Sequence, residues 1–278
     1  CCYRGAAMSK ISVVLPVLAP TPFLRAMTEF CIKTLRLHAD HKFELVVVEA
    51  EHDYFDPNTP VWAPDAGGAY PRKEMSVPVE YAAVGCPDKY LNFSPKIGGV
   101  RETNAGFDAA TGDYIVYAGN DVFVPPHWDT ELLRPFELYP DCGVSSLSAF
   151  EPAYVIGPMQ PSDLIVEGMY SPFMMWRNGW RFDEDYKQVY QDSDLIMRMY
   201  ADGKRAYRTC RAHVHHLMRM TSDRVDTVAH DRQLALDEGL FYQRWGKSPL
   251  AMFGMIRSGQ WTYGREYEAL TKPINLHK

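Results

Sequence analysis

The sequence lacks any uninterrupted apolar run near the ~20 residues that a membrane-spanning helix needs. The best candidate, ISVVLPVL at positions 11–18, has only the length of a strand and contains Pro16. An excess of positive charge is also missing, because 29 Lys and Arg stand against 35 Asp and Glu, which gives a net charge of −6. We therefore expect no transmembrane segment and no surface built mainly to hold polyanions.

Cysteine spacings typical of zinc ribbons and disulfide frameworks are missing as well. The cysteines form no CxxC; they are Cys1, Cys2, Cys31, Cys86, Cys142 and Cys210. Residues 1–7, ahead of Met8, have no apolar core of the kind a secretory leader carries, and we interpret them as an upstream extension or a cloning remnant. Scattered thiols without a leader predict buried cysteines in a reducing compartment, so we expect a cytoplasmic protein.

What the chain does have is ordinary globular composition, since 46% hydrophobic and 23% charged residues exclude a disordered protein. Residues 11–18 form a β-branched run, residues 23–37 place apolar side chains at helical spacing, and residues 43–48 (FELVVV) form a second apolar run. A strand, a helix of this length and another strand make a βαβ unit with parallel strands. We expect an α/β fold with a mostly parallel sheet flanked by helices.

The alternation continues after an interruption. Positions 51–95 contain seven prolines, which predicts an elaborated loop with one short strand at 77–84. The further elements expected are helices at 97–110 and 192–201, and strands at 114–118, 144–149, 170–176 and 206–213. We expect one domain at 8–220 and a helical C-terminal extension at 221–278, packed on that domain and containing a helix at 223–245.

Polar clusters follow several of the expected strands, which matters because ligands of open α/β sheets bind beyond the carboxyl ends of the strands. These clusters are Glu49-Ala50-Glu51, Gly119-Asn120-Asp121, Gln191-Asp192-Ser193-Asp194 and the histidines His213, His215 and His216. Each has a purely structural explanation when taken alone. Asp192 or Asp194 would be a helix N-cap, His213 a buried structural histidine and Glu51 a solvated carboxylate.

Their order and spacing carry more information than any one cluster. Residues 104–115 follow the pattern N-x-G-x-x-x-A-x-G-x-Y-I, and AGNDVFVPPHW follows at 118–128. Further motifs are WRFDE at 180–184, QDSDL at 191–195, VHHL at 214–217 and FYQRWG at 241–246. In this order the motifs resemble those of the family 2 glycosyltransferases, which have the GT-A fold, over roughly Ile11 to Gly246.

The resemblance implies a metal-dependent, inverting glycosyltransferase that uses a nucleotide-diphosphate sugar. Asp121 matches the last Asp of the family's D-x-D, which binds a divalent cation, Mn²⁺ or Mg²⁺. The same comparison makes His216 a metal ligand, with His215 as the second candidate. The residues implied in donor binding are Glu49, Asn120, Asp121 and Pro16. Gly119 stands where the first Asp of D-x-D is usually found.

Catalysis is implied at the QDSDL motif. Asp192 matches the family's general base, which removes the proton from the acceptor hydroxyl, and Gln191 replaces the Glu that usually precedes it. Asp194 and Asn104 are expected to support the site, Asp194 by orienting or capping the helix that presents Asp192.

Two other functions remain open from the sequence. The changes at Gly119 and Gln191 are compatible with a nucleotide-sugar-binding protein without turnover. A nucleotidyltransferase is disfavoured, because residues 19–22 (APTP) replace its glycine-rich, arginine-containing loop.

The acceptor can be a glycan, a lipid-linked sugar, a protein side chain or a hydroxylated nucleobase. The acidic balance weighs against a nucleobase or DNA-directed glycosyltransferase. A local basic patch stays open, however, from Arg177, Arg181, Lys204, Arg205, Arg208 and Arg211. The sequence does not fix the oligomeric state.

Overall fold

The computed structural model describes residues 10–19, 21–50, 86–93, 97–151, 155–156, 160–167, 172–217 and 227–258. Three of the sequence-based predictions lie outside these residues. They are the extension at 1–7, the short strand at 77–84 and the solvated Glu51.

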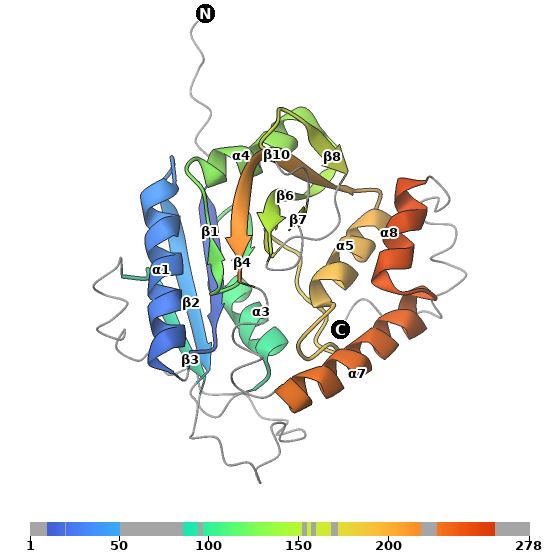
Figure 1. Ribbon diagram of the computed structural model, residues 1–278, viewed down its shortest axis with the longest axis horizontal. Coiled ribbons are helices and arrows are strands. Elements are labelled where there is room, and N and C mark those ends of the chain that lie inside the picture. The colour runs from blue at the N-terminus through green and yellow to red at the C-terminus, as the bar shows by residue number, and fades with distance from the viewer. Residues whose placement is uncertain are drawn as a thin grey trace, which may run out of the picture.

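The described elements alternate between strands and helices as the sequence predicts (Figure 1). Up to the middle of the chain they are β1 (Ile11–Val17), α1 (Pro22–His38), β2 (Phe43–Ala50), β3 (Lys89–Phe93), α3 (Gly99–Ala109), β4 (Tyr114–Ala118), β5 (Val122–Phe123) and α4 (Trp128–Leu138). The remaining ones are β6 (Cys142–Phe150), β7 (Val155–Ile156), β8 (Ile165–Glu167), β9 (Phe173–Arg177), α5 (Gln191–Ala201), β10 (Arg205–His216), α7 (Thr227–Trp245) and α8 (Pro249–Arg257).

All the described strands belong to one sheet. Its main path runs β3-β2-β1-β4-β9-β6-β10-β5, and β7 and β8 add to β6 and β10. The pairings give β3, β2, β1, β4, β6 and β10 one common direction, while β9 lies antiparallel between β4 and β6. The prediction of a mostly parallel α/β sheet is confirmed. Six strands therefore direct their carboxyl ends to the same edge, where parallel sheets bind their ligands.

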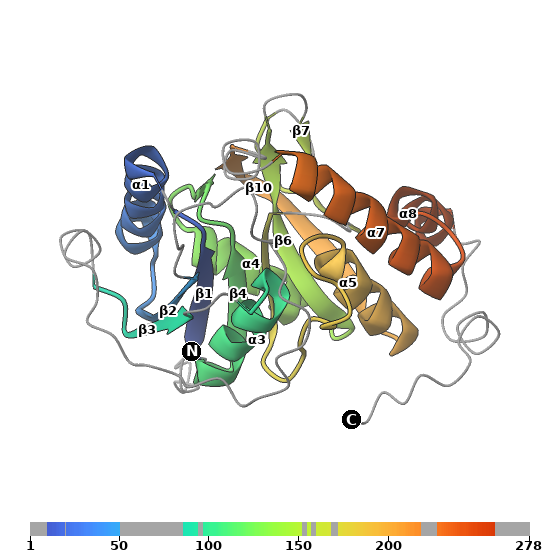
Figure 2. The same cartoon turned by 90° about the horizontal axis from the view of Figure 1, so that it is seen from below.

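Helices cover both faces of the sheet and bury two separate apolar cores. On one face, α1 and α4 contribute to the first core, in which Leu24 of α1 and Trp128 of α4 are fully buried and α4 lies against β6 and β10. On the other face, α3, α5, α7 and α8 form the second core, around Phe107 and Trp176. Figure 2 shows the same arrangement from below, with α7 and α8 beyond α5 and far from α1. None of the described helices is long and apolar enough to cross a membrane.

Helix α4 and the strands β3, β5, β7 and β8 were not predicted from the sequence. Helix α4 follows Pro125-Pro126 and contains Pro135, residues that normally interrupt a helix. Its buried face nevertheless has a helical signal, because Trp128, Leu132 and Phe136 are four residues apart. Strand β3 lies inside the proline-rich stretch, between Pro87 and Pro95, and pairs with β2.

Pro16 is tolerated in β1 because it lies beyond the last residue that pairs with β4. The parallel pairing of β1 with β4 ends at Val14, whereas its pairing with β2 continues to Val17 and Glu49. Proline has no N–H to donate to a neighbouring strand, so a position past the end of one ladder tolerates it. Pro16 thus lies near the carboxyl edge of the sheet, two positions beyond the last residue paired to β4.

Gly106 is the point where α3 approaches the sheet most closely. A Cβ atom at this position would lie 2.6 Å from Val14 Cγ1 and 2.6 Å from Val48 Cγ2. Both valines are fully buried, so neither can move aside without disturbing the core.

Gly106→Ala should therefore destabilise the protein by about 1–3 kcal/mol, because the added methyl group overpacks the helix–sheet contact. Gly239→Ala is the matched control, since Gly239 lies in α7 with open space around its Cβ position and should gain up to ~1 kcal/mol of helix propensity. Urea unfolding measures both. Equal stability of the two variants would contradict the close approach at Gly106.

Candidate active site

The turn between β4 and β5 presents Asp121 at the carboxyl edge of the sheet. β4 ends at Ala118, and the Val122 N–H donates to the Gly119 carbonyl at 3.3 Å, which closes the turn. Asp121 is only 8% exposed. Desolvation by burial raises the pKa of its carboxyl, and the nearby His216 opposes this rise. Burial therefore makes the charged form of this carboxylate unfavourable, and a cation bound beside it would stabilise that form.

His216 faces Asp121 from the end of β10. Its Nε2 atom lies 3.5 Å from Asp121 Oδ1. Two ligands of one divalent cation, each about 2.1 Å from it, are at most ~4.2 Å apart, so this pair fits neighbouring positions around an ion. His215 points elsewhere, because it is exposed and its ring lies 5.3 Å from that of Phe150. Among the described residues, no group of three or more His, Cys, Asp or Glu side chains could hold a metal.

Gly119 gives Asp121 the room that its side chain occupies. A Cβ atom on Gly119 would lie only 2.8 Å from Asp121 Oδ1. With the carboxylate in this orientation, the turn has no space for the additional Asp that D-x-D motifs have at this position. The site thus has one carboxylate in this turn, and His216 lies beside it.

Asp192 lies in the first turn of α5, at the same edge of the sheet. The interpretation of Asp192 or Asp194 as the N-cap is wrong, because α5 begins at Gln191 and its N-cap is Tyr190. Tyr190 adopts a left-handed backbone conformation, with φ 63°, which is uncommon for a residue with a side chain. The Asp192 carboxylate accepts a hydrogen bond from the Ser193 N–H at 2.7 Å. Asp192 is partly exposed, but the surrounding protein desolvates it enough to raise its pKa.

Tyr117 links the two parts of the site. Burial is the largest cause of its raised pKa, and the negative charges of Asp192 and Asp121 raise that pKa further. Gln191 forms a side-chain hydrogen bond with the Tyr117 hydroxyl, which acts in the opposite direction. The phenol is therefore near enough to both Asp121 and Asp192 for each negative charge to act on its hydroxyl. No sequence motif marks Tyr117, although it lies two residues before the Gly119-Asn120-Asp121 cluster.

Asp194 is fully buried and binds α5 to the C-terminal helix α7. Its Oδ1 atom accepts hydrogen bonds from Arg244 Nη1 at 3.1 Å and Trp245 Nε1 at 3.0 Å. Its Oδ2 atom accepts one from Arg198 Nε at 2.8 Å. Asp194 thus supports the helix that carries Asp192 by pairing with two arginines.

A second buried carboxylate, this one from α7, holds the loop that precedes α5. Asp237 is 2% exposed, and its carboxylate accepts hydrogen bonds from three successive backbone N–H groups. They belong to Lys187 at 3.3 Å, Gln188 at 2.9 Å and Val189 at 3.0 Å. No motif in the sequence marked Asp237, because its partners are backbone groups from a segment about 50 residues away.

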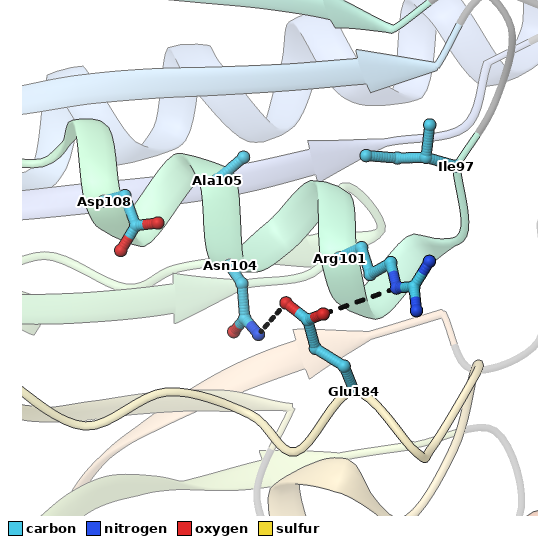
Figure 3. A pocket seen from close by; sticks show the side chains of 6 residues that line it. All are labelled: Ile97, Arg101, Asn104, Ala105, Asp108 and Glu184. Atoms are coloured by element: carbon cyan, nitrogen blue, oxygen red, sulfur yellow. Dashed lines mark hydrogen bonds and ion pairs between the residues drawn. The ribbon is translucent and has the colours of Figure 1, made fainter. Parts of the chain in front are cut away.

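Asn104 joins α3 to the segment before this loop. Its Nδ2 donates to the Phe182 carbonyl at 2.9 Å, and its Oδ1 accepts from the Phe182 N–H at 3.0 Å. A pocket of about 270 Å³ lies alongside, lined by Ile97, Arg101, Asn104, Ala105, Asp108 and Glu184. Figure 3 shows that Glu184 reaches toward both Asn104 and Arg101 there. Asn104 thus fixes the position of the WRFDE segment relative to α3.

The expected donor-binding residues lie at the carboxyl ends of three adjacent strands, β2, β1 and β4. Glu49 lies inside β2, which continues to Ala50, and its Oε2 accepts a hydrogen bond from the Tyr90 hydroxyl at 2.6 Å. Asn120, in the turn after β4, donates through Nδ2 to Thr28 Oγ1 of α1 at 3.0 Å. With Pro16 in β1, these positions border the same edge as Asp121.

Residues 89–200 match the family model described as glycosyl transferase family 2. This part of the chain is similar to that family. The glycosyltransferase segment runs from the start of β3 to the end of α5 and contains Asn104, Asp121 and Asp192. Glu49 and His216 lie outside it, although they border the same edge. No curated protein sequence matches the chain significantly.

A solved structure extends the likeness to the fold of the larger part of the chain. The crystal structure of S. aureus TarS matches with a TM-score of 0.52 and 14% identity, covering 82% of this chain and 42% of TarS. The crystal structure of S. aureus TarS 1-349 matches with a TM-score of 0.47 and 15% identity, covering 78% of this chain and 63% of that one. The chain thus spans about two fifths of the length of the first. The likeness to the first of these structures supports the GT-A fold predicted from the motifs.

Asp194→Asn should destabilise the protein by about 3–5 kcal/mol, because it removes a buried carboxylate and leaves Arg198 and Arg244 without that charge partner. Asp108→Asn is the control, because it breaks an ion pair of the same length, 2.8 Å to Arg181, at the surface. Surface pairs contribute only ~0–1 kcal/mol. Urea unfolding compares the two variants, and similar small losses would show that Asp194 does not hold α7 on α5.

Proposed function

We propose that the protein is a metal-dependent, inverting glycosyltransferase that moves a sugar from a nucleotide-diphosphate sugar to an acceptor hydroxyl. One observation carries the proposal. The Asp121–His216 pair and Asp192 come from distant parts of the chain, yet the charges of Asp121 and Asp192 both act on the hydroxyl of the partly buried Tyr117. A cation-binding pair beside a carboxylate with a raised pKa meets the two requirements of this reaction, a place for the leaving diphosphate and a base.

Asp121 and His216 would hold the divalent cation, with oxygens of the donor diphosphate and water as its other ligands. When bound, Mn²⁺ or Mg²⁺ stabilises the negative charge that develops on the departing diphosphate. Asp121 suits this role because its carboxylate is desolvated and so interacts strongly with a cation. His216 brings a neutral nitrogen donor that adds no further negative charge beside the diphosphate.

Asp192 would act as the general base. Inversion requires the acceptor hydroxyl to attack the anomeric carbon from the face opposite the leaving group while losing its proton. The raised pKa of Asp192 makes its carboxylate a stronger base than an exposed aspartate, and its partial exposure leaves it accessible to an acceptor. The hydrogen bond from the Ser193 N–H occupies Oδ1, which leaves Oδ2 to receive the proton.

The donor nucleoside would lie over the carboxyl ends of β1, β2 and β4. Glu49 is 6% exposed and accepts a hydrogen bond from the Tyr90 hydroxyl, so its carboxylate has a fixed orientation at that edge. Asn120 and Pro16 border the same region between β2 and Asp121. This order along the sheet would place the nucleoside beside Glu49 and the diphosphate beside Asp121.

Ion pairing of the basic residues supports an acceptor other than a nucleic acid. Three of the arginines considered for a phosphate-binding patch pair with carboxylates: Arg181 with Asp108 at 2.8 Å, Arg205 with Asp141 at 3.4 Å and Arg211 with Glu131 at 3.1 Å. Arginines that are already neutralised contribute little to phosphate binding. We propose a glycan or another hydroxyl-bearing molecule as the acceptor.

Asp121→Asn should abolish most Mn²⁺-dependent donor turnover while leaving the unfolding temperature close to that of the wild type, because the amide is a poor ligand for a hard cation. Release of nucleotide diphosphate from a panel of nucleotide sugars measures this effect. Full wild-type activity in excess chelator would contradict the metal dependence. Donor binding without any turnover in the wild type would favour a nucleotide-sugar-binding protein.

Asp192→Asn should lower turnover by about 10²- to 10⁴-fold with donor binding retained, because an amide cannot accept the proton. It should unfold at the same or a higher temperature than the wild type at neutral pH, because burial penalises the charged carboxylate. The pKa of Asp192 is higher in the folded chain than its unfolded value of ~3.9. The destabilisation by the charged carboxylate therefore develops as the pH rises above the unfolded pKa, and it is absent at lower pH. The stability difference should therefore vanish in acid.

Asp202→Asn is the matched control, since Asp202 is exposed at the opposite end of α5. Steady-state kinetics and thermal unfolding are measured on both variants. Wild-type turnover in Asp192→Asn would exclude it as the base.

A further inference from the structure

Glu151 lies on the side of His216 that faces away from Asp121. Glu151 follows β6 directly, and β6 runs parallel to β10, with Phe150 paired to His215. Glu151 and His216 are therefore the next positions along two neighbouring parallel strands. Glu151 Oε1 lies 2.8 Å from His216 Nδ1, while His216 Nε2 faces Asp121 at 3.5 Å. The imidazole thus bridges two carboxylates, one at each ring nitrogen.

We propose that Glu151 is a positioning residue that orients His216 for metal binding, an inference that rests on the proposed function. A neutral imidazole carries its proton on one nitrogen and offers the other as a ligand. A carboxylate that accepts the proton of Nδ1 fixes the ring orientation and leaves Nε2 free to bind a cation. Glu151 therefore directs His216 Nε2 toward the position between this ring and Asp121.

The burial of Glu151 argues for such a role rather than for a contribution to stability. Its side chain has no exposed surface, and His216 is its one ion-pair partner among the residues that the structure describes. The second oxygen, Oε2, is also buried and has no hydrogen-bond partner among those residues. A buried carboxylate with an unsatisfied oxygen costs folding free energy. What it gains in this position is the strong hydrogen bond to His216.

The same geometry separates His216 from its neighbour His215. His215 is exposed and its ring lies against that of Phe150, and among the described residues no carboxylate pairs with it. His216 has 11% of its side chain exposed and is held at both nitrogens. Glu151 thus selects which of the two histidines serves as the ligand.

The test measures Mn²⁺ binding to the full chain, with neither donor nor acceptor present, by electron paramagnetic resonance of the free ion. Glu151→Ala should raise the Mn²⁺ dissociation constant about 10- to 100-fold, the usual effect of removing the partner of a metal-binding histidine. Glu151→Gln should cause a smaller loss, since its amide oxygen still accepts from Nδ1 but forms a weaker hydrogen bond than a carboxylate. His215→Ala is the control and should bind Mn²⁺ as the wild type does.

His216→Ala tells the two proposals apart. If it binds Mn²⁺ as tightly as the wild type, the metal assignment in the proposed function fails. If it binds weakly while Glu151→Ala binds normally, that assignment stands and the positioning role is overturned. A fall in the unfolding temperature of Glu151→Ala with unchanged Mn²⁺ affinity likewise overturns it. Should Glu151→Ala not fold, Glu151→Gln decides, and wild-type affinity in that variant overturns the proposal.

Discussion

The buried carboxylate of Asp194 joins the helix that carries Asp192 to the C-terminal helix α7. It receives hydrogen bonds from Arg198 within α5 and from Arg244 and Trp245 at the end of α7. A carboxylate without exposed surface is tolerable only when its charge is matched, and two arginines match it here. The position of Asp192 at the edge of the sheet depends on this contact, because both residues lie in the same helical turn.

Helix α7 also holds the segment that precedes α5. Asp237 binds three backbone N–H groups of the loop before α5, and Arg244 also pairs with Asp183 at 2.7 Å. Residues of α7 thus contact both the loop before α5 and the first turn of α5. This constraint stabilises the left-handed conformation of Tyr190, which a free loop would not maintain. The C-terminal part of the chain therefore contributes to the site without supplying its proposed reactive groups.

The reactive groups themselves are not arranged for stability. Burial raises the pKa of both Asp121 and Asp192, so each charged form is less favourable in the folded chain than in water. Glu151 adds a third buried carboxylate at the same edge, with one oxygen unsatisfied among the described residues. The extensive cores on the two faces of the sheet offset these costs. A catalytic site that concentrates negative charge is consistent with a reaction in which a cation binds there.

The sequence by itself determined the α/β alternation and the placement of Glu49, Asp121 and Asp192 near strand or helix ends, because periodicity and local spacing encode both. It missed α4, whose four-residue spacing of Trp128, Leu132 and Phe136 was obscured by neighbouring prolines.

Only the tertiary structure decided where α5 starts. It also decided that Asp194 of α5 contacts α7, and that Asp237 of α7 contacts the loop before α5. It also placed Glu151 beside His216, although the two residues are 65 positions apart in the sequence. The local sequence pattern shows at which end of a strand a side chain lies, and therefore at which edge of the sheet. Its partners there depend on strand order and helix packing, which bring together residues that no short motif contains.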